Sequence, residues 1–142
     1  KYLLLQNGVT LQVHETEDTV FSDEKWLCFI LNQLISNAVK YRRDPPVLTF
    51  RAVRDQDTLT LSLQDNGIGI DARDLPRIFD KGFTGQNGRR SAPNATGLGL
   101  YLCKRLCDKL DIGLQAQSSP GGTTLSLTFR INDFIHGVQG PL

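Results

Sequence analysis

The sequence predicts an α+β domain in which helices pack on one face of a mixed, mostly antiparallel sheet, giving a two-layer sandwich. Short segments in which apolar and polar residues alternate indicate half-buried strands. Longer segments with apolar residues every three or four positions indicate amphipathic helices. In chain order the pattern is β-β-α-β-β-α-loop-α-β-β, which is typical of a layered α+β domain.

Length and composition indicate one globular domain over residues 1–142. The chain is 39% hydrophobic and 22% charged with a formal net charge of +1, so nothing marks it as a nucleic-acid binder. Its apolar stretches are shorter than the roughly 20 residues that span a bilayer. The chain opens without methionine in a strand-like region. We therefore expect residues 1–8 to be a linker remnant of a longer protein and residues 132–142 to be a weakly packed tail.

The first half of the chain predicts two strands and a long helix. Residues 9–13 alternate like a strand, and residues 19–21 are interpreted as its hairpin partner. Ser22 is the expected N-cap of a helix, with acidic residues in the first turn where they favour the helix dipole. Prolines in the segment 44–46 are expected to end this helix.

The second half predicts two more antiparallel strand pairs, separated by helices and a loop. Residues 80–96 have no apolar periodicity, and a loop of this length in a compact domain suggests a lid or binding loop. The expected elements are strands 47–53 and 59–64, a short helix at 71–79, a helix from Gly97, and strands 113–117 and 123–129.

The cysteines predict reduced thiols. Cys28, Cys103 and Cys107 lie in apolar helical segments, and their odd number does not suggest a disulfide framework. Cys103 and Cys107 are one helical turn apart, but no histidine or further cysteine pair lies near them in the sequence. We therefore do not interpret them as a metal site.

A motif at the end of a predicted strand, "DNGIGI" at 65–70, is the first candidate site. The carboxylate of Asp65 can accept a hydrogen bond from an exocyclic amine such as that of adenine, and Gly67 and Gly69 let the backbone approach closely. The alternative is a plain strand-to-helix turn in which Asp65 caps the next helix.

Two further motifs suit metal and phosphate. Gln33, Asn37 and Lys40 share one helical face, where asparagine offers a neutral oxygen to Mg²⁺ and lysine a charge to phosphate. The glycines of "TGLGL" at 96–100 precede a helix, whose free N–H groups can bind an anion. The alternatives are a solvated helix face and a simple helix start.

Together, "NQLISNAVKY", "DNGIGI", "FDKGFTG" and "TGLGL" have the order and spacing of the N, G1, F and G2 boxes. The chain resembles, from about Val9 to Phe129, the ATP-binding catalytic domain of sensor histidine kinases, in the superfamily of Bergerat-fold ATPases and kinases. The segments 20–41 and 79–89 resemble most the small-membrane-sensor kinases of Gram-positive bacteria that respond to cell-envelope antibiotics.

The resemblance implies a role for each motif residue. Asp65 would bind the adenine amine beside Gly67 and Gly69, Asn37 would ligate Mg²⁺, and Lys40 would reach phosphate. Tyr41 would lie against the base, and Phe79 and Phe83 would anchor an ATP lid. The further nucleotide-binding residues that it implies are Ile70, Lys81, Thr96, Gly97, Leu98, Gly99, Leu100 and Thr123.

Gln33, Asn37 and Lys40 are the catalytic residues that the resemblance implies, and Gln33 departs from the superfamily pattern. Hydrolysing members carry at this position a glutamate that activates water, and a neutral amide cannot take that proton. Many histidine kinases have asparagine here. Gln33 therefore favours a kinase over an ATPase.

A sensor kinase of this type would phosphorylate a histidine on its own dimerisation domain, act as a homodimer and pass the phosphoryl group to a response regulator. His14 and His136 lie in turn-like and tail settings and are not expected to be the acceptor, which should lie upstream. The domain would be the cytoplasmic part of a bacterial membrane protein, attached through upstream segments. The alternatives are a free-standing serine kinase of the anti-sigma type and a nucleotide-binding module without catalysis.

Overall fold

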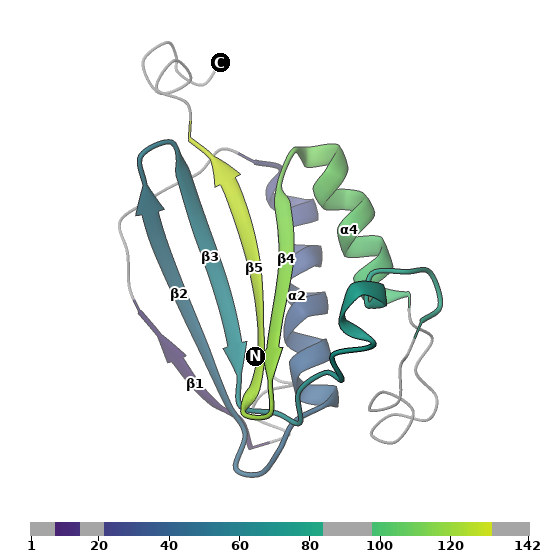
Figure 1. Ribbon diagram of the computed structural model, residues 1–142. Helices are drawn as coiled ribbons and strands as arrows, with labels where there is room; N and C mark the ends of the chain where they lie inside the picture. The colour runs from purple at the N-terminus through teal and green to yellow at the C-terminus, as the bar shows by residue number, and fades with distance from the viewer. Residues whose placement is uncertain (1–7, 15–21, 84–97, 132–142) are drawn as a thin grey trace.

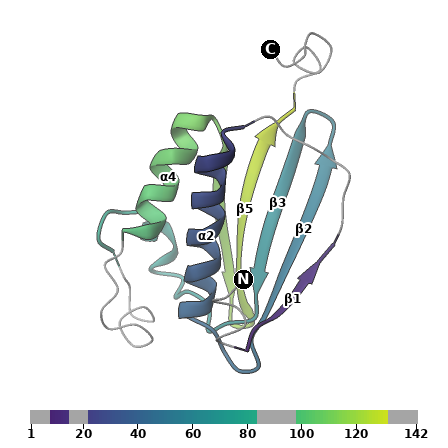
Figure 2. The ribbon, with the colours of Figure 1, turned by 180° about the vertical axis from the view of Figure 1, so that it is seen from behind.

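The computed structural model describes residues 8–14, 22–83 and 98–131, which form a sheet with two helices on one face (Figures 1 and 2). The strands are β1 (Thr10–Val13), β2 (Val47–Asp55), β3 (Thr58–Asp65), β4 (Gly113–Ser119) and β5 (Gly122–Arg130). The helices are α2 (Glu24–Lys40) and α4 (Gly99–Leu110), with the 3₁₀ turn η1 (Leu75–Arg77) between them in sequence.

The sheet has the strand order β1-β2-β3-β5-β4. The pairs β2–β3, β3–β5 and β4–β5 are antiparallel, whereas β1 pairs with β2 in parallel, from Thr10 opposite Val47 to Val13 opposite Phe50. The sheet is thus mixed and mostly antiparallel, which confirms the predicted fold class. The proposed hairpin partner of the first strand, residues 19–21, lies outside the described residues.

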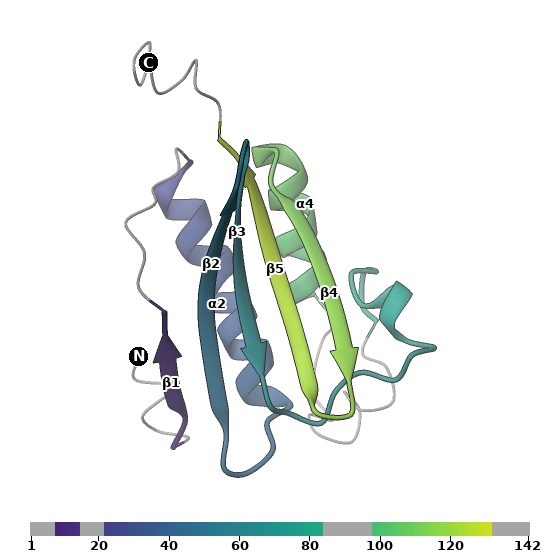
Figure 3. The same cartoon turned by 60° about the vertical axis from the view of Figure 1, so that its left-hand side comes forward.

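The hydrophobic core lies between the sheet and the two helices, as the view along the sheet shows (Figure 3). The strands β2, β3, β4 and β5 send every second side chain to this face, as the pleat requires, whereas all four residues of β1 are exposed. Leu48, Leu63 and Leu127 on the strands, and Ile30 and Leu34 on α2, are at most 3% exposed. Burial of each such side chain stabilises the fold by about 1.5–3 kcal/mol.

The opposite face of the sheet carries small polar side chains. Thr60 lies opposite Thr128 and Ser62 opposite Ser126, with their hydroxyl oxygens 3.4 Å apart in both pairs. This one-sided pattern is typical of an antiparallel sheet with one face towards water. The helices therefore leave the second face of the sheet open to solvent.

The bounds of α2 differ from the prediction at both ends. Asp23, not Ser22, is the N-cap, because its carboxylate accepts a hydrogen bond of 3.2 Å from the backbone N–H of Trp26. The helix ends at Lys40 with Tyr41 as its C-cap, before the prolines that were expected to end it. The turn that follows is fixed instead by contacts of Tyr41 with a distant loop.

The middle of the chain is less helical than expected. Residues 71–79 form hydrogen-bonded turns around η1 rather than one continuous helix. The predicted lid, residues 80–96, lies mostly outside the described residues. In the described part of the chain, no helix is both long enough and apolar enough to cross a membrane.

Candidate functional site

Strand alternation places Asp65 on the helix-facing side of the sheet, at the end of the central strand β3. Leu59, Leu61 and Leu63 precede it on the same face of β3, and Asp65 is the last residue of that strand. The C-terminal end of α2 and the turn between β4 and β5 lie at this same end of the molecule (Figure 1). The fold therefore brings three distant parts of the sequence around one carboxyl group.

One oxygen of the Asp65 carboxylate is held by the backbone. Oδ1 accepts hydrogen bonds from the N–H of Gly67, at 2.8 Å, and of Thr123, at 3.0 Å. Burial raises the pKa of Asp65, and these two hydrogen bonds oppose that rise. Within the described part of the chain, Oδ2 receives no hydrogen bond. The carboxylate thus presents one fixed acceptor to a ligand.

The two glycines after Asp65 sit where a side chain has no room. A Cβ on Gly67 would lie 2.5 Å from the carbonyl oxygen of Tyr41, and a Cβ on Gly69 would lie 2.5 Å from that of Ser119. Gly69 also has a φ of 79°, which glycine adopts readily. The loop 65–70 is therefore in backbone contact with α2 on one side and the β4–β5 turn on the other.

Tyr41 holds this loop through its backbone. Its carbonyl oxygen accepts a hydrogen bond of 3.1 Å from the N–H of Ile68. The phenol is half-buried, and burial raises its pKa, so Tyr41 stays neutral at physiological pH. The side chain was expected to lie against the base, and the structure places the backbone of Tyr41 beside the loop that carries Asp65.

Ser118, near the end of β4, binds the loop 65–70, and sequence analysis missed it. Its hydroxyl accepts a hydrogen bond of 2.7 Å from the N–H of Ile70 and lies 3.1 Å from the hydroxyl of Thr123. The sequence around Ser118 was interpreted only as a turn. No local pattern could have revealed this contact, since Ile70 is distant in sequence.

Asn66, inside the first glycine motif, was also missed as a functional position. Its side-chain oxygen accepts from the N–H of Val47 and its amide donates to the carbonyl of Pro45, both at 2.9 Å. These bonds join the end of β3 to the start of β2. Asn66 therefore fixes the strand end from which Asp65 extends.

The predicted polar face of α2 leads from the helix interface to the solvent. Gln33 and Asn37 are half-buried and Lys40 is exposed. The side-chain oxygen of Gln33 lies 2.8 Å from where a Cβ on Gly99 would be, so Gln33 contacts the first residue of α4. Asn37 lies one helical turn beyond Gln33, towards the Asp65 loop.

The glycine motif before α4 is described in part. Leu98 is the N-cap of α4 and is 38% exposed, whereas Leu100 packs against the core. Thr96 and Gly97 lie outside the described residues. The helix start is thus placed, but not the whole predicted phosphate loop.

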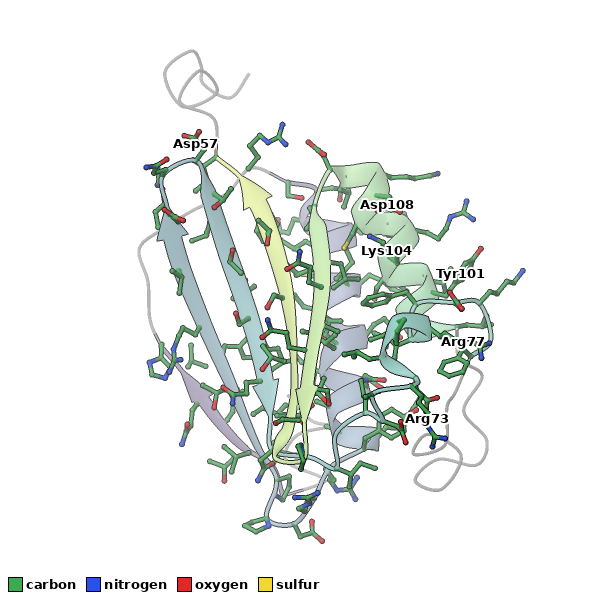
Figure 4. All side chains as sticks on the ribbon, in the orientation of Figure 1. Asp57, Arg73, Arg77, Tyr101, Lys104 and Asp108 are labelled. Atoms are coloured by element: carbon green, nitrogen blue, oxygen red, sulfur yellow. The ribbon has the colours of Figure 1, made fainter. Side chains whose placement is uncertain are left out.

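Three of the predicted lid residues, Phe79, Lys81 and Phe83, lie in the described part of the chain. Phe79 packs against the core, and the guanidinium of Arg77 lies 4.4 Å from the ring centre of Phe83. The Lys81 Nζ is 5.9 Å from the ring centre of Tyr101. Figure 4 shows Arg77 and Tyr101 near the start of α4. In this arrangement Lys81 contacts an aromatic ring of α4.

The described residues suit a nucleotide. The half-buried carboxylate of Asp65 has one oxygen that can accept a hydrogen bond from an amine. The glycines let a ligand come close to the backbone, and the N–H groups at the start of α4 can bind an anion. The described residues contain no group of three or more histidine, cysteine or acidic side chains that could hold a metal ion. Asn37, the predicted Mg²⁺ ligand, lies half-buried on α2.

A separate hollow of about 360 Å³ lies at the other end of the sheet from Asp65. Its lining includes Lys104, Cys107 and Asp108 of α4, and Thr58, Thr128 and Arg130 of the sheet. Lys104 and Asp108 form an ion pair of 3.4 Å on α4 (Figure 4). None of the predicted site residues lines this hollow.

The sequence model of one protein family, described as histidine kinase-, DNA gyrase B-, and HSP90-like ATPase, matches residues 22–133. The chain belongs to this family. The match covers α2, the Asp65 loop and α4, so the ATP-binding domain predicted from the four motifs is confirmed. This family binds ATP, whose adenine carries an amine that donates hydrogen bonds. The Asp65 carboxylate offers a matching acceptor.

Curated relatives in this family are sensor kinases of Gram-positive bacteria, as the resemblance implied. The sensor protein BceS of Halalkalibacterium halodurans is 42% identical over 92% of this chain, and that of Bacillus subtilis 40% identical over 95%. The sensor protein kinase GraS of Staphylococcus aureus is 38% identical over 85% of the chain. The matches span only 39%, 40% and 35% of these relatives.

Solved structures share the fold at low sequence identity. The mycobacterial sensor histidine kinase MprB has a TM-score of 0.80 at 20% identity, over 91% of this chain and 88% of that one. The catalytic domain of histidine kinase ThkA has a TM-score of 0.73 at 17% identity, over 89% and 82%. The two-layer fold is therefore that of histidine kinase catalytic domains.

Proposed function

We propose that this domain binds Mg²⁺·ATP and transfers the γ-phosphoryl group to a histidine on a dimerisation domain upstream in the same protein. One observation carries the proposal: Asp65 is half-buried, with Oδ1 held by Gly67 and Thr123 and Oδ2 available. This geometry fits the exocyclic amine of adenine, which is a donor, and rejects the carbonyl of guanine, which is an acceptor. Family membership and the sensor-kinase relatives support the same function.

We assign the remaining contacts by element. The base would lie against the loop 65–70 and the β4–β5 turn, between Tyr41, Ile70 and Thr123. Asn37 would hold Mg²⁺, and the first turn of α4 with Lys40 would hold the phosphates. The lid that follows would be anchored by Phe79 and Phe83, and Lys81 would give it a positive charge.

Bound Mg²⁺·ATP supplies an activated phosphoryl group, and the residues of this chain orient it. The Gln33 amide is neutral and accepts no proton from water, so the site lacks the base that hydrolysis needs at this position. Transfer to a histidine depends instead on positioning and on charge stabilisation. This favours a kinase over an ATPase.

The partners follow from the same assignment. Sensor kinases work with a dimerisation domain and a response regulator, and we infer both for the full-length protein. The catalytic domain would then face the cytoplasm, with membrane attachment through segments upstream of it.

The test supplies the purified domain with a separate helical hairpin that carries the acceptor histidine, taken from the full-length protein. Labelled γ-phosphate should appear on the hairpin as acid-labile phosphohistidine. The controls are Asp65→Asn in the domain and glutamine in place of the acceptor histidine. Acid-stable phosphoserine on a partner would support the serine-kinase alternative, and ATP binding without transfer would support a non-catalytic module.

A further inference from the structure

The helices α2 and α4 approach closely along an antiparallel seam that ends at the nucleotide site. The thiol of Cys103 on α4 lies 3.9 Å from the carbonyl oxygen of Ile30 on α2. One turn earlier on α4, Gly99 meets Gln33, which is one turn later on α2. Figure 2 shows the two helices side by side on the sheet. The seam therefore runs from the core towards Asn37.

The space that a side chain at position 99 would take is occupied by the flexible end of the Gln33 side chain and by no backbone atom. A Cβ at position 99 would lie 2.8 Å from Oε1 of Gln33 and 3.9 Å from its Cδ. The first of these distances is shorter than a van der Waals contact allows. The two positions thus share one volume, with a long side chain on α2 and none on α4.

The length of Gln33 matters for this contact. Asparagine is shorter by one methylene, so its amide would stop short of Gly99 and leave a gap at the seam. Gln33 and Asn37 are four residues apart on α2, so both lie on the side of the helix that faces the start of α4. A change in the 33–99 contact therefore moves the start of α4 relative to Asn37.

We propose that Gln33 is a positioning residue that sets where α4 begins, with Gly99 as its required counterpart. The pair fixes the spacing between the Mg²⁺ ligand on α2 and the phosphate-binding turn of α4. This inference rests on the proposed function, because it assigns those two groups to the γ-phosphate end of ATP. Gln33 acts through α4 and needs no contact with the reacting atoms.

A double-substitution cycle tests the pair. Gly99→Ala should lower the affinity for Mg²⁺·ATP about fivefold, since the methyl group displaces the amide end of Gln33 from the start of α4. Gln33→Asn alone should lower it by a few-fold. The double variant should return to within about twofold of the parent, because the shorter amide makes room for the methyl group.

The matched control shortens a glutamine elsewhere. Gln64 is exposed on the outward face of β3. Gln64→Asn should leave the Gly99→Ala defect unchanged. Each variant is also measured with ADP, which lacks the γ-phosphate. A positioning role predicts a larger loss for Mg²⁺·ATP than for ADP, whereas a purely structural role lowers both equally.

Thermal unfolding of the same variants reports the contact without nucleotide. If the unfolding midpoint of the double variant recovers towards that of the parent, the contact between Gln33 and Gly99 is supported. If the two single changes lower the midpoint additively, the inference is overturned. If Gly99→Ala does not fold, a folded double variant is itself the recovery, and an unfolded one contradicts the inference. A parent domain that binds no nucleotide would refute the proposed function, while the unfolding cycle would still test the contact.

Discussion

The carboxylate of Asp65 and the backbone N–H of Thr123 are joined by a hydrogen bond of 3.0 Å across 58 residues of sequence. The same oxygen accepts from Gly67, so both of its contacts are with the backbone. Oδ1 therefore has a fixed place in the fold, and in the proposed function Oδ2 would face the adenine amine. This division of roles within one carboxylate determines how a substitution at position 65 will behave.

Asp65→Asn should weaken ATP binding by about 100-fold and GTP binding far less. Gly67 and Thr123 require an acceptor at Oδ1, so the asparagine must place its NH₂ group where Oδ2 was. That group is a donor and faces the donor amine of adenine. Titration calorimetry with both nucleotides measures the effect, and unchanged ATP affinity would contradict the assignment.

The same substitution should not destabilise the fold at neutral pH. Burial raises the pKa of Asp65, so its contribution to stability is complete below the ordinary aspartate value, about 4, and is lost as the pH rises through the folded-state value. Asparagine stays neutral and keeps both backbone hydrogen bonds. Its unfolding midpoint at pH 7 should equal or exceed that of the parent, and the difference should shrink towards pH 4. A large loss at pH 7 would show that the carboxylate charge supports the fold.

Asn37→Ala should remove the benefit of Mg²⁺ for ATP binding, because the amide oxygen is the proposed protein ligand of the cation. The ratio of ATP affinity in excess Mg²⁺ to that in EDTA should fall to about one. Asn32→Ala is the control, since Asn32 is exposed on the same helix. A variant at position 37 that responds to Mg²⁺ like the parent would exclude this ligand.

Two adjacent glycines in the β4–β5 turn should differ sharply in their tolerance of alanine. Gly122 has a φ of 141°, and a Cβ there would overlap the carbonyl oxygen of Asp65. Gly122→Ala should therefore lower the free energy of unfolding by about 2 kcal/mol or more. A Cβ on Gly121 would meet only the Ser119 hydroxyl, at 3.9 Å, so Gly121→Ala should change it by less than about 0.5 kcal/mol. Chemical denaturation measures both, and equal losses would contradict the geometry.

The three thiols should react at two very different rates. Cys28 is exposed, whereas Cys103 and Cys107 are fully buried, and burial raises their pKa to about 12 and about 11. An aromatic disulfide reagent at pH 8 should titrate one thiol in the native domain and all three in denaturant. Cys28→Ser should abolish the fast phase. A second fast thiol in the native domain would mean that the α2–α4 seam opens readily.

Local patterns predicted most of the fold. The alternation in 59–64 and 123–129 located β3 and β5, and the apolar stripe of α2 located the long helix, because these signals lie within single elements. The helix ends were less accurate. Asp23 and Ser22 are both good capping residues, and side-chain geometry decides between them.

Contacts between distant segments could not be predicted in this way. The link from Ser118 to Ile70, the bonds of Asn66 to the start of β2, and the meeting of Gln33 with Gly99 depend on the order of strands and the seating of helices. The motifs marked the position of Asp65, but the backbone groups that hold it became visible only in three dimensions. The ligand-binding and catalytic roles assigned to all of the predicted site residues remain predictions.

The position of Thr123 on β5 predicts that mutations away from the nucleotide can change the nucleotide preference. The β4–β5 hairpin supplies one of the two backbone donors that orient Asp65. Substitutions that alter the closure of this hairpin should therefore change the preference for adenine over guanine without contacting the nucleotide. A genetic selection for relaxed base preference should accordingly recover substitutions at Ser118 as well as at the aspartate itself.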